Sequence, residues 1–257
     1  MKEMTDTLTA NTLKKVASLD DRKWRRREGA FKAEGSKCVL DTLPHFTLRA
    51  LYATSAWIES HEDVAFRHGD KLATASRGDL RAMSSLVTPP EVLAVYDIPV
   101  RELPADAART NLVLALDTIQ DPGNLGTIIR VADWFGITDI IASRETADCF
   151  SPKVIQSTMG AISRVRVHYC DLCDTIPAMG AGAVYGTFLD GDPIGTATLS
   201  PTGVIVIGNE GNGISPRVAS LVTSRLLIPS FPPDRETSES LNAAVATAIT
   251  LAKFRGL

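Results

Sequence analysis

The hydrophobic positions of this chain change their pattern near residue 111. From there on, continuous apolar runs of strand length recur, and segments of helical character separate most of them. The runs are residues 112–116, 140–142, 165–167, 183–185, 204–207 and 226–228. Continuous apolar runs are typical of strands buried on both faces, so residues 111–257 are expected to form an α/β domain with a parallel sheet. Ligands bind such sheets beyond the carboxyl ends of the strands.

Residues 1–98 show shorter apolar runs between polar helical stretches. The candidate strands are 38–40, 51–53 and 92–95, and short helices are expected around 58–68 and 76–84. This pattern predicts a small α/β domain. Residues 99–110 begin with a proline-bounded stretch without periodicity, which indicates a linker between the two domains.

The composition is that of an ordinary globular protein, with 257 residues, of which 44% are hydrophobic and 22% charged. No basic, apolar and small-residue order follows Met1, and no apolar run approaches the length of about 18 residues that spans a bilayer. We therefore expect no membrane association and a cytoplasmic location. Four cysteines are too few for a disulfide framework in a chain of this length.

One short segment has the residue types of a metal site. Cys170 and Cys173 are three residues apart and follow His168, and two such sulfurs can share a zinc ion. No second Cys/His pair stands at a matching spacing. Reduced structural cysteines are therefore the preferred interpretation, and no metal is predicted.

The net charge of −3 conceals a basic segment. Residues 12–37 carry nine Lys/Arg against four Asp/Glu, so this segment is near +5. Clustered cations favour contacts with phosphates, which makes RNA a candidate partner, whereas the alternative is an ordinary solvated helix face. Trp24 lies within the cluster and is either exposed or part of the core. The candidate RNA-binding residues are Arg22, Lys23, Arg25, Arg26 and Arg27.

A loop with special residues follows the 112–116 run. Pro122-Gly123 breaks the chain, and Asn124 stands where a helix would begin and where its side chain could act as the cap. Apolar residues then follow at helical spacing as far as Gly136, a natural stop. Arg130 lies six residues beyond Asn124, or about 9 Å along a helix axis, so its side chain could reach back toward the loop.

Two further motifs follow the last two apolar runs. Gly208-Asn209-Glu210-Gly211 can bring backbone close to a ligand, but its glycine spacing is not that of a dinucleotide-binding loop. Ser240-Leu241-Asn242 opens a segment in which apolar residues form the stripe of an amphipathic helix. The positions of that stripe are 241, 245, 248, 249 and 252.

In their order and spacing, these motifs resemble the three signature motifs of the SpoU (TrmH-like) group of SPOUT RNA ribose 2′-O-methyltransferases. The resemblance implies a deep trefoil knot in the parallel-sheet domain, a homodimer, and S-adenosyl-L-methionine as the cofactor. The catalytic residues that it implies are Asn124, Arg130, Glu210, Ser240 and Asn242. The cofactor-binding residues that it implies are Thr187, Gly208, Asn209, Gly211, Ile228, Pro229, Leu241 and Asn242.

The role of Arg130 has two interpretations. In the family this arginine meets the target ribose hydroxyl and is described as a base. A guanidinium stays protonated at accessible pH, so positioning of the hydroxyl and phosphate is equally consistent with the residue type. Two positions depart from the family pattern: the loop at 230–238 is a few residues longer, and Gln156 stands where many relatives carry arginine.

The first domain resembles the RNA substrate-binding domain that precedes the catalytic domain in rRNA-directed members. Phe31 before Glu34-Gly35 is the most recognisable part. The resemblance therefore implies methylation of structured RNA, with 23S rRNA preferred over tRNA. The alternatives are a tRNA methyltransferase, a non-catalytic RNA-binding protein that kept the fold and, less consistent with the glycine spacing, a nicotinamide-dependent dehydrogenase.

Overall fold

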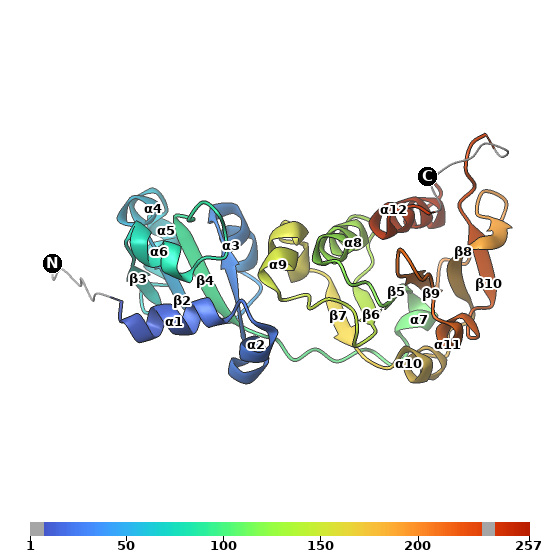
Figure 1. Ribbon diagram of the computed structural model, residues 1–257, viewed down its shortest axis with the longest axis horizontal. Coiled ribbons are helices and arrows are strands. Elements are labelled where there is room, and N and C mark those ends of the chain that lie inside the picture. The colour runs from blue at the N-terminus through green and yellow to red at the C-terminus, as the bar shows by residue number, and fades with distance from the viewer. Residues whose placement is uncertain (1–7, 233–239) are drawn as a thin grey trace. The chain divides into compact units, whose positions relative to one another are not determined.

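The structure is a computed structural model that describes residues 8–232 and 240–257. These residues form two compact units, drawn in Figure 1. One unit contains the described part of Met1–Val100 together with Phe150–Ser163, and the other contains Arg101–Cys149 together with the described part of Arg164–Leu257. Most of the lengthened loop predicted at 230–238 lies outside the described residues. None of the helices that the described residues form has both the length and the apolarity to cross a membrane.

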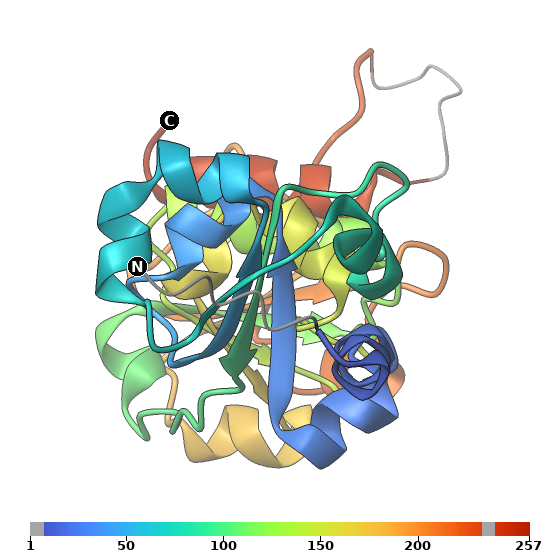
Figure 2. The same ribbon diagram turned by 90° about the vertical axis from the view of Figure 1, so that its left-hand side faces the viewer.

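The first unit is built on a mixed four-stranded sheet with the order β1-β4-β2-β3. Its strands are β1 (Ala30–Glu34), β2 (Leu48–Ala53), β3 (Leu72–Thr74) and β4 (Val92–Asp97). β4 pairs antiparallel with both β1 and β2, and β3 pairs parallel with β2. The strands lie side by side with helices on both faces in Figure 2. The small α/β domain predicted for this part of the chain is therefore present.

The helices of this unit divide between the two faces of the sheet. They are α1 (Ala10–Ser18), α2 (Arg22–Glu28), α3 (Ser36–Thr42), α4 (Ser55–Ser60), α5 (Glu62–Arg67), α6 (Arg77–Met83), α9 (Pro152–Thr158) and the 3-10 helix η1 (Ala161–Ser163). Val16 of α1 and Leu80 and Met83 of α6 bury one face. On the other face the Phe31 ring lies 5.0 Å from the ring of Phe46 and 4.7 Å from that of Phe150.

The strand predicted at residues 38–40 is wrong, because these residues belong to helix α3. Gly35 has a φ of +88°, which ends β1 and turns the chain. Cys38, Val39 and Thr42 are then buried at helical spacing. A run of three apolar residues is too short to distinguish a strand from the buried side of a helix.

The second unit contains a six-stranded parallel sheet with the order β10-β8-β9-β5-β6-β7. Its strands are β5 (Leu112–Asp117), β6 (Asp139–Ala142), β7 (Arg166–Tyr169), β8 (Val184–Pro193), β9 (Gly203–Gly208) and β10 (Ser224–Leu227). Every residue of the central strand β5 is buried, as expected for a strand covered on both faces. The predicted parallel sheet is confirmed, and all six apolar runs contribute a strand. The trefoil knot stays a prediction.

Helices cover both faces of this sheet (Figure 1). They are α7 (Ala107–Thr110), α8 (Pro122–Trp134), α10 (Leu172–Ala178), α11 (Pro216–Ala219) and α12 (Ala243–Phe254). α7, α10 and α11 bury one hydrophobic cluster with β5, β8 and β9. α8 and α12 pack against each other on the opposite side. The sheet therefore separates the helices that carry the signature motifs from those that do not.

The apolar stripe predicted for the last helix does not face the core. Leu241, Val245 and Ile249 are 44%, 47% and 38% exposed, and α12 instead buries Ala243, Ala244, Thr247, Thr250 and Leu251. Small side chains allow this helix to lie close to its neighbours, so the larger residues are left on the outer face. The prediction of a helix is confirmed, but the prediction of its buried face is wrong.

Candidate active site

The turn after β5 sets up the first part of the site. Thr118 has a left-handed φ of +61°. The chain enters α8 at Asp121, whose carboxylate accepts a hydrogen bond from the backbone N–H of Asn124 at 2.8 Å. Pro122 at the first helical position suits this start, because proline lacks the amide that would otherwise need a partner. Asn124 is therefore not the helix cap that the sequence suggested. Asp121 has that role, and the Asn124 side chain is available for other contacts.

Three segments distant in sequence meet through the Asn124 side chain. Asn242 caps α12, and its Oδ1 accepts from the amides of Ala244 and Val245 at 3.0 and 3.3 Å. Its Nδ2 must then be the group that donates to Asn124 Oδ1, at 2.9 Å. The Asn124 Nδ2 in turn donates to Glu210 Oε1. These contacts form a directional chain from α12 through α8 to the loop after β9.

Ser240 joins the same place, since its hydroxyl donates to the backbone oxygen of Glu210 at 3.4 Å. Of the five residues predicted to be catalytic, the structure brings four together: Asn124, Glu210, Ser240 and Asn242. We call this group the polar chain. It lies beyond the carboxyl ends of β5 and β9, which are neighbours with Asp117 opposite Gly208. This is the position at which parallel sheets bind ligands.

The loop that carries Glu210 is folded tightly on itself. Asn209 pairs with Gly213 through both backbone groups, at 3.0 and 2.9 Å, and its Oδ1 accepts from the Gly211 amide at 2.9 Å. Its Nδ2 donates to the backbone oxygen of Thr118 at 2.9 Å, which ties the loop to the turn after β5. A Cβ on Gly208 would lie 2.3 Å from the backbone of Gly213, so only glycine fits there. Asn209 thus holds the shape of the loop from which Glu210 projects.

Arg130 does not join the polar chain within this molecule. It is exposed on α8 and makes no hydrogen bond or ion pair with the residues that the structure describes. Trp134, one turn further along the same helix, is 84% exposed. The outer faces of α8 and α12 therefore combine a cation with large apolar side chains.

The positions predicted to bind the cofactor lie within β8, at and after the end of β9, directly after β10 and directly before α12. β8 pairs with β9 as far as Gly186 opposite Val206, and Thr187 is the next residue of β8. Gly208 and Ile228 are half-buried, whereas Leu241 and Pro229 are exposed. Apolar side chains next to strand-end backbone are the surroundings that an adenosine group needs, so these residues fit S-adenosylmethionine.

The basic cluster of the first unit lies on α2, but its members differ in exposure. Lys23, Arg26 and Arg27 are exposed. Arg25 is 2% exposed, and its Nη1 donates to the backbone oxygens of Leu19 and Asp20 at 2.7 and 2.8 Å. Arg25 therefore does not present its charge to RNA as predicted, because its guanidinium faces inward and binds backbone oxygens.

The candidate zinc residues lie at the end of β7 and at the start of α10. His168 Nε2 lies 2.9 Å from Asp139 Oδ1, and Cys170 and Cys173 are half-buried free thiols. Burial raises the pKa of Cys170, which opposes the thiolate form that binds metals. Within residues 8–232 and 240–257, no three His, Cys, Asp or Glu side chains are grouped as metal ligands.

Sequence reasoning does not give the structural roles of two residues that shape this site. Asp121, and not Asn124, caps α8, although Asp before Pro is a recognisable helix start. Asn209, predicted to bind the cofactor, also holds the loop through its side chain, and its contact with the cofactor stays a prediction. No local pattern could have indicated the bond between Asn209 and Thr118, because it joins residues 91 positions apart.

Comparison with known proteins agrees with this geometry. Residues 111–252 match the SpoU rRNA Methylase family, and residues 10–94 match the MRM3-like substrate binding domain. The 23S rRNA (guanosine(2553)-2′-O)-methyltransferase RlmP of Bacillus subtilis is 32% identical over 244 residues, which cover 93% of each chain.

Two solved structures extend the similarity to the whole fold. A protein assigned to the TrmH family of RNA methyltransferases, from Porphyromonas gingivalis, has a TM-score of 0.85 and 40% identity, with 96% of this chain and 98% of that chain covered. An AdoMet-bound rRNA methyltransferase from Sinorhizobium meliloti has a TM-score of 0.83 and 28% identity, with 97% and 96% covered.

Proposed function

Because the chain belongs to the SpoU rRNA methylase family, we infer that it methylates rRNA at a ribose 2′-hydroxyl with S-adenosylmethionine as the methyl donor. The observation that carries this function is the polar chain, which joins all three signature motifs at the carboxyl edge of the parallel sheet. A non-catalytic RNA-binding protein would have no need for this arrangement. The functions of relatives that are rRNA methyltransferases favour rRNA over tRNA as the substrate.

The polar chain would orient the acceptor ribose. S-adenosylmethionine, when bound, supplies a methyl group on a sulfonium, and the protein must align the ribose oxygen with it. Glu210 uses one carboxylate oxygen for Asn124, so its other oxygen can accept a hydrogen bond from the 2′-hydroxyl. Asn242 links this contact to α12, and the proposed cofactor residue Leu241 directly precedes Asn242 in the chain. The ribose and the methyl donor would thus be held by one connected structure.

Arg130 would hold the phosphate and hydroxyl of the target nucleotide. Its planar guanidinium suits bidentate contact with a phosphate, and its permanent charge favours the developing negative charge on the ribose oxygen. In this role the arginine lowers the cost of deprotonation without itself taking the proton. The proton would pass to the free Glu210 carboxylate oxygen and from there to water, and the methyl donor would leave as the neutral thioether.

We further propose that the enzyme is a homodimer in which Arg130 of one subunit completes the site of the other. Arg130 makes no contact with the polar chain of its own subunit among the described residues. The exposed apolar residues Val245, Ile249 and Trp134 lie on the two helices that carry the signature motifs, and they offer a surface for a second copy.

Mixing two inactive variants tests the shared site. An Arg130→Ala chain and an Asn124→Ala chain should regain roughly a quarter of wild-type activity when mixed, since half of the dimers are mixed and each has one intact site. Activity that stays at the level of the separate variants, in a mixture whose mixed dimers are verified, would contradict the exchange of Arg130. Sedimentation of a fully active monomer would contradict the dimer itself.

The proposed domain boundaries follow the two family matches. We propose an RNA substrate-binding domain at 1–98, a linker at 99–110 and a catalytic domain at 111–257, supported by the matches at 10–94 and 111–252. Within these bounds, α7 at the end of the linker packs with the second unit, and Phe150–Ser163 packs with the first unit. A ribosomal substrate supports a cytoplasmic location. The exposed cations Lys23 and Arg26 on α2 would contact RNA phosphates, and Arg27 is exposed beside them.

The function is tested by mapping 2′-O-methyl groups in total RNA from cells with and without the gene. Loss of one methylated ribose in 23S rRNA, restored by the wild-type gene and not by an Asn124→Ala gene, is the expected result. An unchanged pattern of 2′-O-methyl groups in rRNA, together with a lost methyl group in tRNA, would show that the substrate is tRNA.

A further inference from the structure

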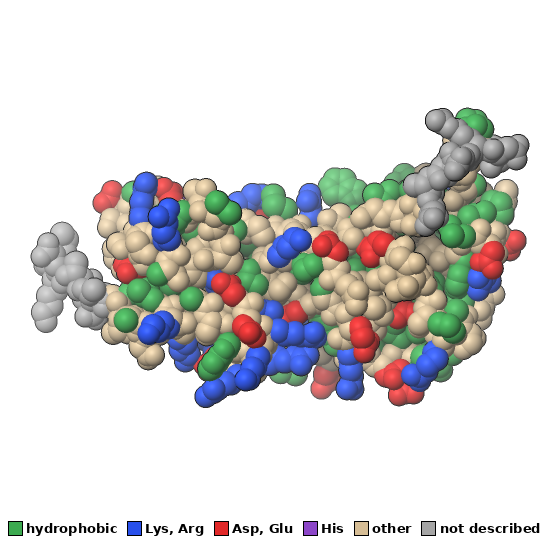
Figure 3. Space-filling model, viewed as in Figure 1, with side chains coloured by type: hydrophobic (Ala, Val, Ile, Leu, Met, Phe, Trp, Pro, Cys, Tyr) green, Lys and Arg blue, Asp and Glu red, His purple; other side chains and the backbone are tan. Residues whose placement is uncertain are grey.

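The outer face of α2 presents an aromatic side chain among cations. Trp24 is 37% exposed, whereas Trp57, the other tryptophan of this unit, is 1% exposed and belongs to the core. Lys23, Arg26 and Arg27 are exposed on the same seven-residue helix. Figure 3 shows the basic side chains gathered over this helix. The alternative that Trp24 is a core residue does not hold.

Trp24 and Arg27 form a stacked pair. They are one helical turn apart, and the Arg27 guanidinium carbon lies 4.9 Å from the centroid of the Trp24 ring. Arg27 Nε is also 4.0 Å from Glu28, whose other carboxylate oxygen pairs with Lys15 at 3.1 Å. An indole and a guanidinium plane are the two kinds of protein surface on which nucleic-acid bases stack.

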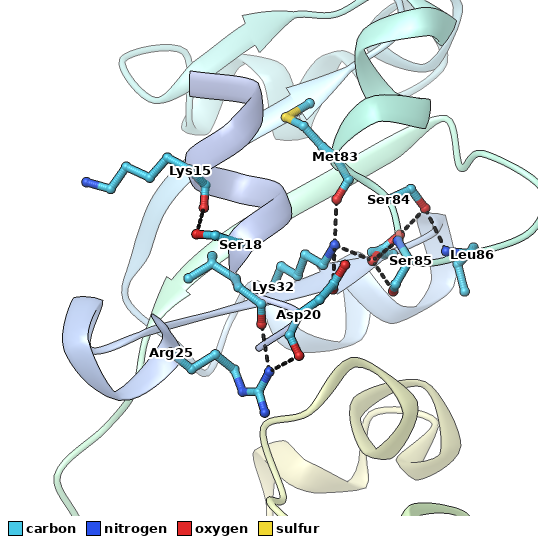
Figure 4. A network of polar contacts seen from close by, with 11 residues as sticks. Lys15, Ser18, Asp20, Arg25, Lys32, Met83, Ser84, Ser85 and Leu86 are labelled. Carbon is cyan, nitrogen blue, oxygen red and sulfur yellow. Dashed lines mark hydrogen bonds and ion pairs between the residues drawn. The ribbon is translucent and has the colours of Figure 1, made fainter. Parts of the chain in front are cut away.

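The inner face of the same helix is fixed to the unit by buried charges (Figure 4). Arg25 donates to the backbone oxygens of Leu19 and Asp20, as described above. The Asp20 carboxylate in turn lies 2.9 Å from the ammonium group of Lys32 on β1. The turn that begins α2 is therefore attached to a strand of the sheet through two cations.

Lys32 is the centre of this buried network. Its side chain is fully buried and also contacts the Glu34 carboxylate at 3.1 Å and the Met83 backbone oxygen. Glu34 accepts hydrogen bonds from the amide of Ser85 at 3.1 Å and from its hydroxyl at 2.7 Å. Because each buried charge has a partner from another segment, the position of α2 is set before any ligand arrives. A surface held in this way loses little conformational entropy on binding.

We propose that Trp24 and Arg27 form a stacking site for an unpaired base of the RNA substrate. Lys23 and Arg26 would contact the phosphates on either side of that base, and the Lys32 network would hold the helix in position. The proposal rests on the proposed function, because it names what the first unit recognises in its RNA. The base must be unpaired, since a base within a duplex has both faces covered by its neighbours. The density of exposed cations on α2 favours RNA over an apolar protein partner.

Tryptophan fluorescence of the full-length chain tests the site directly. The chain has three tryptophans, so a Trp134→Phe variant leaves Trp24 as the one exposed indole, with Trp57 buried. We expect a single-stranded RNA oligonucleotide to quench this emission in a saturable manner, because a stacked base contacts the indole directly. A fully paired, blunt-ended RNA duplex should bind through phosphates with little quenching. Equal quenching by both RNAs would overturn the stacking site.

Substitutions separate stacking from charge. Trp24→Leu keeps an apolar side chain but removes the ring, and it should weaken binding of single-stranded RNA about tenfold while leaving duplex binding unchanged. Its affinity should keep the wild-type dependence on salt, because no phosphate contact is lost, whereas Arg26→Ala should lower that dependence. Trp24→Phe retains an aromatic face and should recover most of the affinity.

The possible outcomes distinguish this site from the proposed function. If Trp24→Leu binds single-stranded RNA as the wild type does, while the wild type still methylates rRNA, the stacking site is wrong and the function stands. Methyl transfer that fails in the wild type would contradict the function, whatever the fluorescence shows. If Trp24→Leu weakens single-stranded and duplex binding equally, Trp24 serves the structure of α2 and the site is also wrong.

Discussion

Each of the two units holds a polar network that joins segments distant in sequence, but the networks differ in charge and exposure. The polar chain of the second unit consists of amides, a hydroxyl and one carboxylate, and its side chains are half-buried or exposed. The Lys32 network of the first unit consists of full charges, and Lys32 and Glu34 are buried. Water can replace a lost partner in the polar chain, whereas it cannot reach the buried charges of the Lys32 network. Breaking the polar chain should therefore reduce activity, whereas breaking the Lys32 network should reduce stability.

The largest effect is expected where a buried charge loses its partner. Lys32→Ala leaves Glu34 buried without its cation, which should lower the free energy of unfolding of the first unit by about 3–5 kcal/mol. Lys37→Ala is the matched control, because Lys37 is exposed and pairs with Asp41 at 3.0 Å, a contact worth less than about 1 kcal/mol. Chemical denaturation measures both. Similar losses for the two variants would remove the contrast between the networks.

The polar chain should respond in activity. Asn124→Ala breaks the bonds to Glu210 and Asn242 together, so methyl transfer should fall at least about 100-fold, the effect of losing an oriented polar contact in a transition state. Thr127→Ala, on the same helix, removes only a bond to the Gly123 backbone and should leave the rate nearly unchanged. Steady-state methylation and thermal melting compare them. A large loss of stability in Asn124→Ala without a specific loss of activity would make the polar chain structural.

A smaller effect is expected where the polar chain meets the cofactor residues. Asn242→Ala removes the cap of α12 as well as the bond to Asn124, so the first turn of that helix should loosen and S-adenosylmethionine should bind about tenfold more weakly. Asn242→Ser can still cap the helix and should lose less. Arg130→Ala should bind the cofactor within a few-fold of wild type. Isothermal titration that finds equal affinities for Asn242→Ala, Arg130→Ala and wild type would refute this arrangement.

The smallest expected effect is on the salt dependence of RNA binding. It distinguishes the exposed cations of α2 from the buried Arg25. Changing Lys23 and Arg26 together to Ala should lower the salt slope of RNA binding by roughly 1.4, at about 0.7 counterion per contact. Arg25→Ala should leave that slope unchanged and lower the melting temperature instead, because its contacts are with backbone oxygens. Filter binding at several salt concentrations measures the slopes. A slope that falls with Arg25→Ala alone would reverse the assignment.

The sequence predicted those features that depend on long, uniform patterns. Strands β5 and β9 are buried through most of their length, and runs such as 112–116 and 204–207 have few other interpretations. The signature motifs were also sufficient to predict that Asn124, Glu210, Ser240 and Asn242 come together. Their spacing in the chain cannot give the direction of the hydrogen bonds, which depends on the cap that Asn242 makes.

The errors came from tertiary contacts that local patterns do not contain. The predicted strand at 38–40 is a helix because Gly35 turns the chain before it. Arg25 faces inward because two backbone oxygens of the preceding turn accept its guanidinium. α12 buries its small residues and leaves Val245 and Ile249 outside, where a second subunit would cover them in the proposed dimer.

The most direct test of the account is single-turnover methyl transfer by Arg130→Ala and by the wild-type enzyme. Labelled S-adenosylmethionine and 23S rRNA are supplied in both reactions, and the RNA is digested to nucleosides so that 2′-O-methylribose is identified. The account predicts a 2′-O-methylated nucleoside from the wild type and a rate at least about 100-fold lower from Arg130→Ala, with cofactor affinity within a few-fold of wild type. Transfer by Arg130→Ala at near the wild-type rate would contradict the proposed site, and a methyl group found on a base would contradict the proposed reaction.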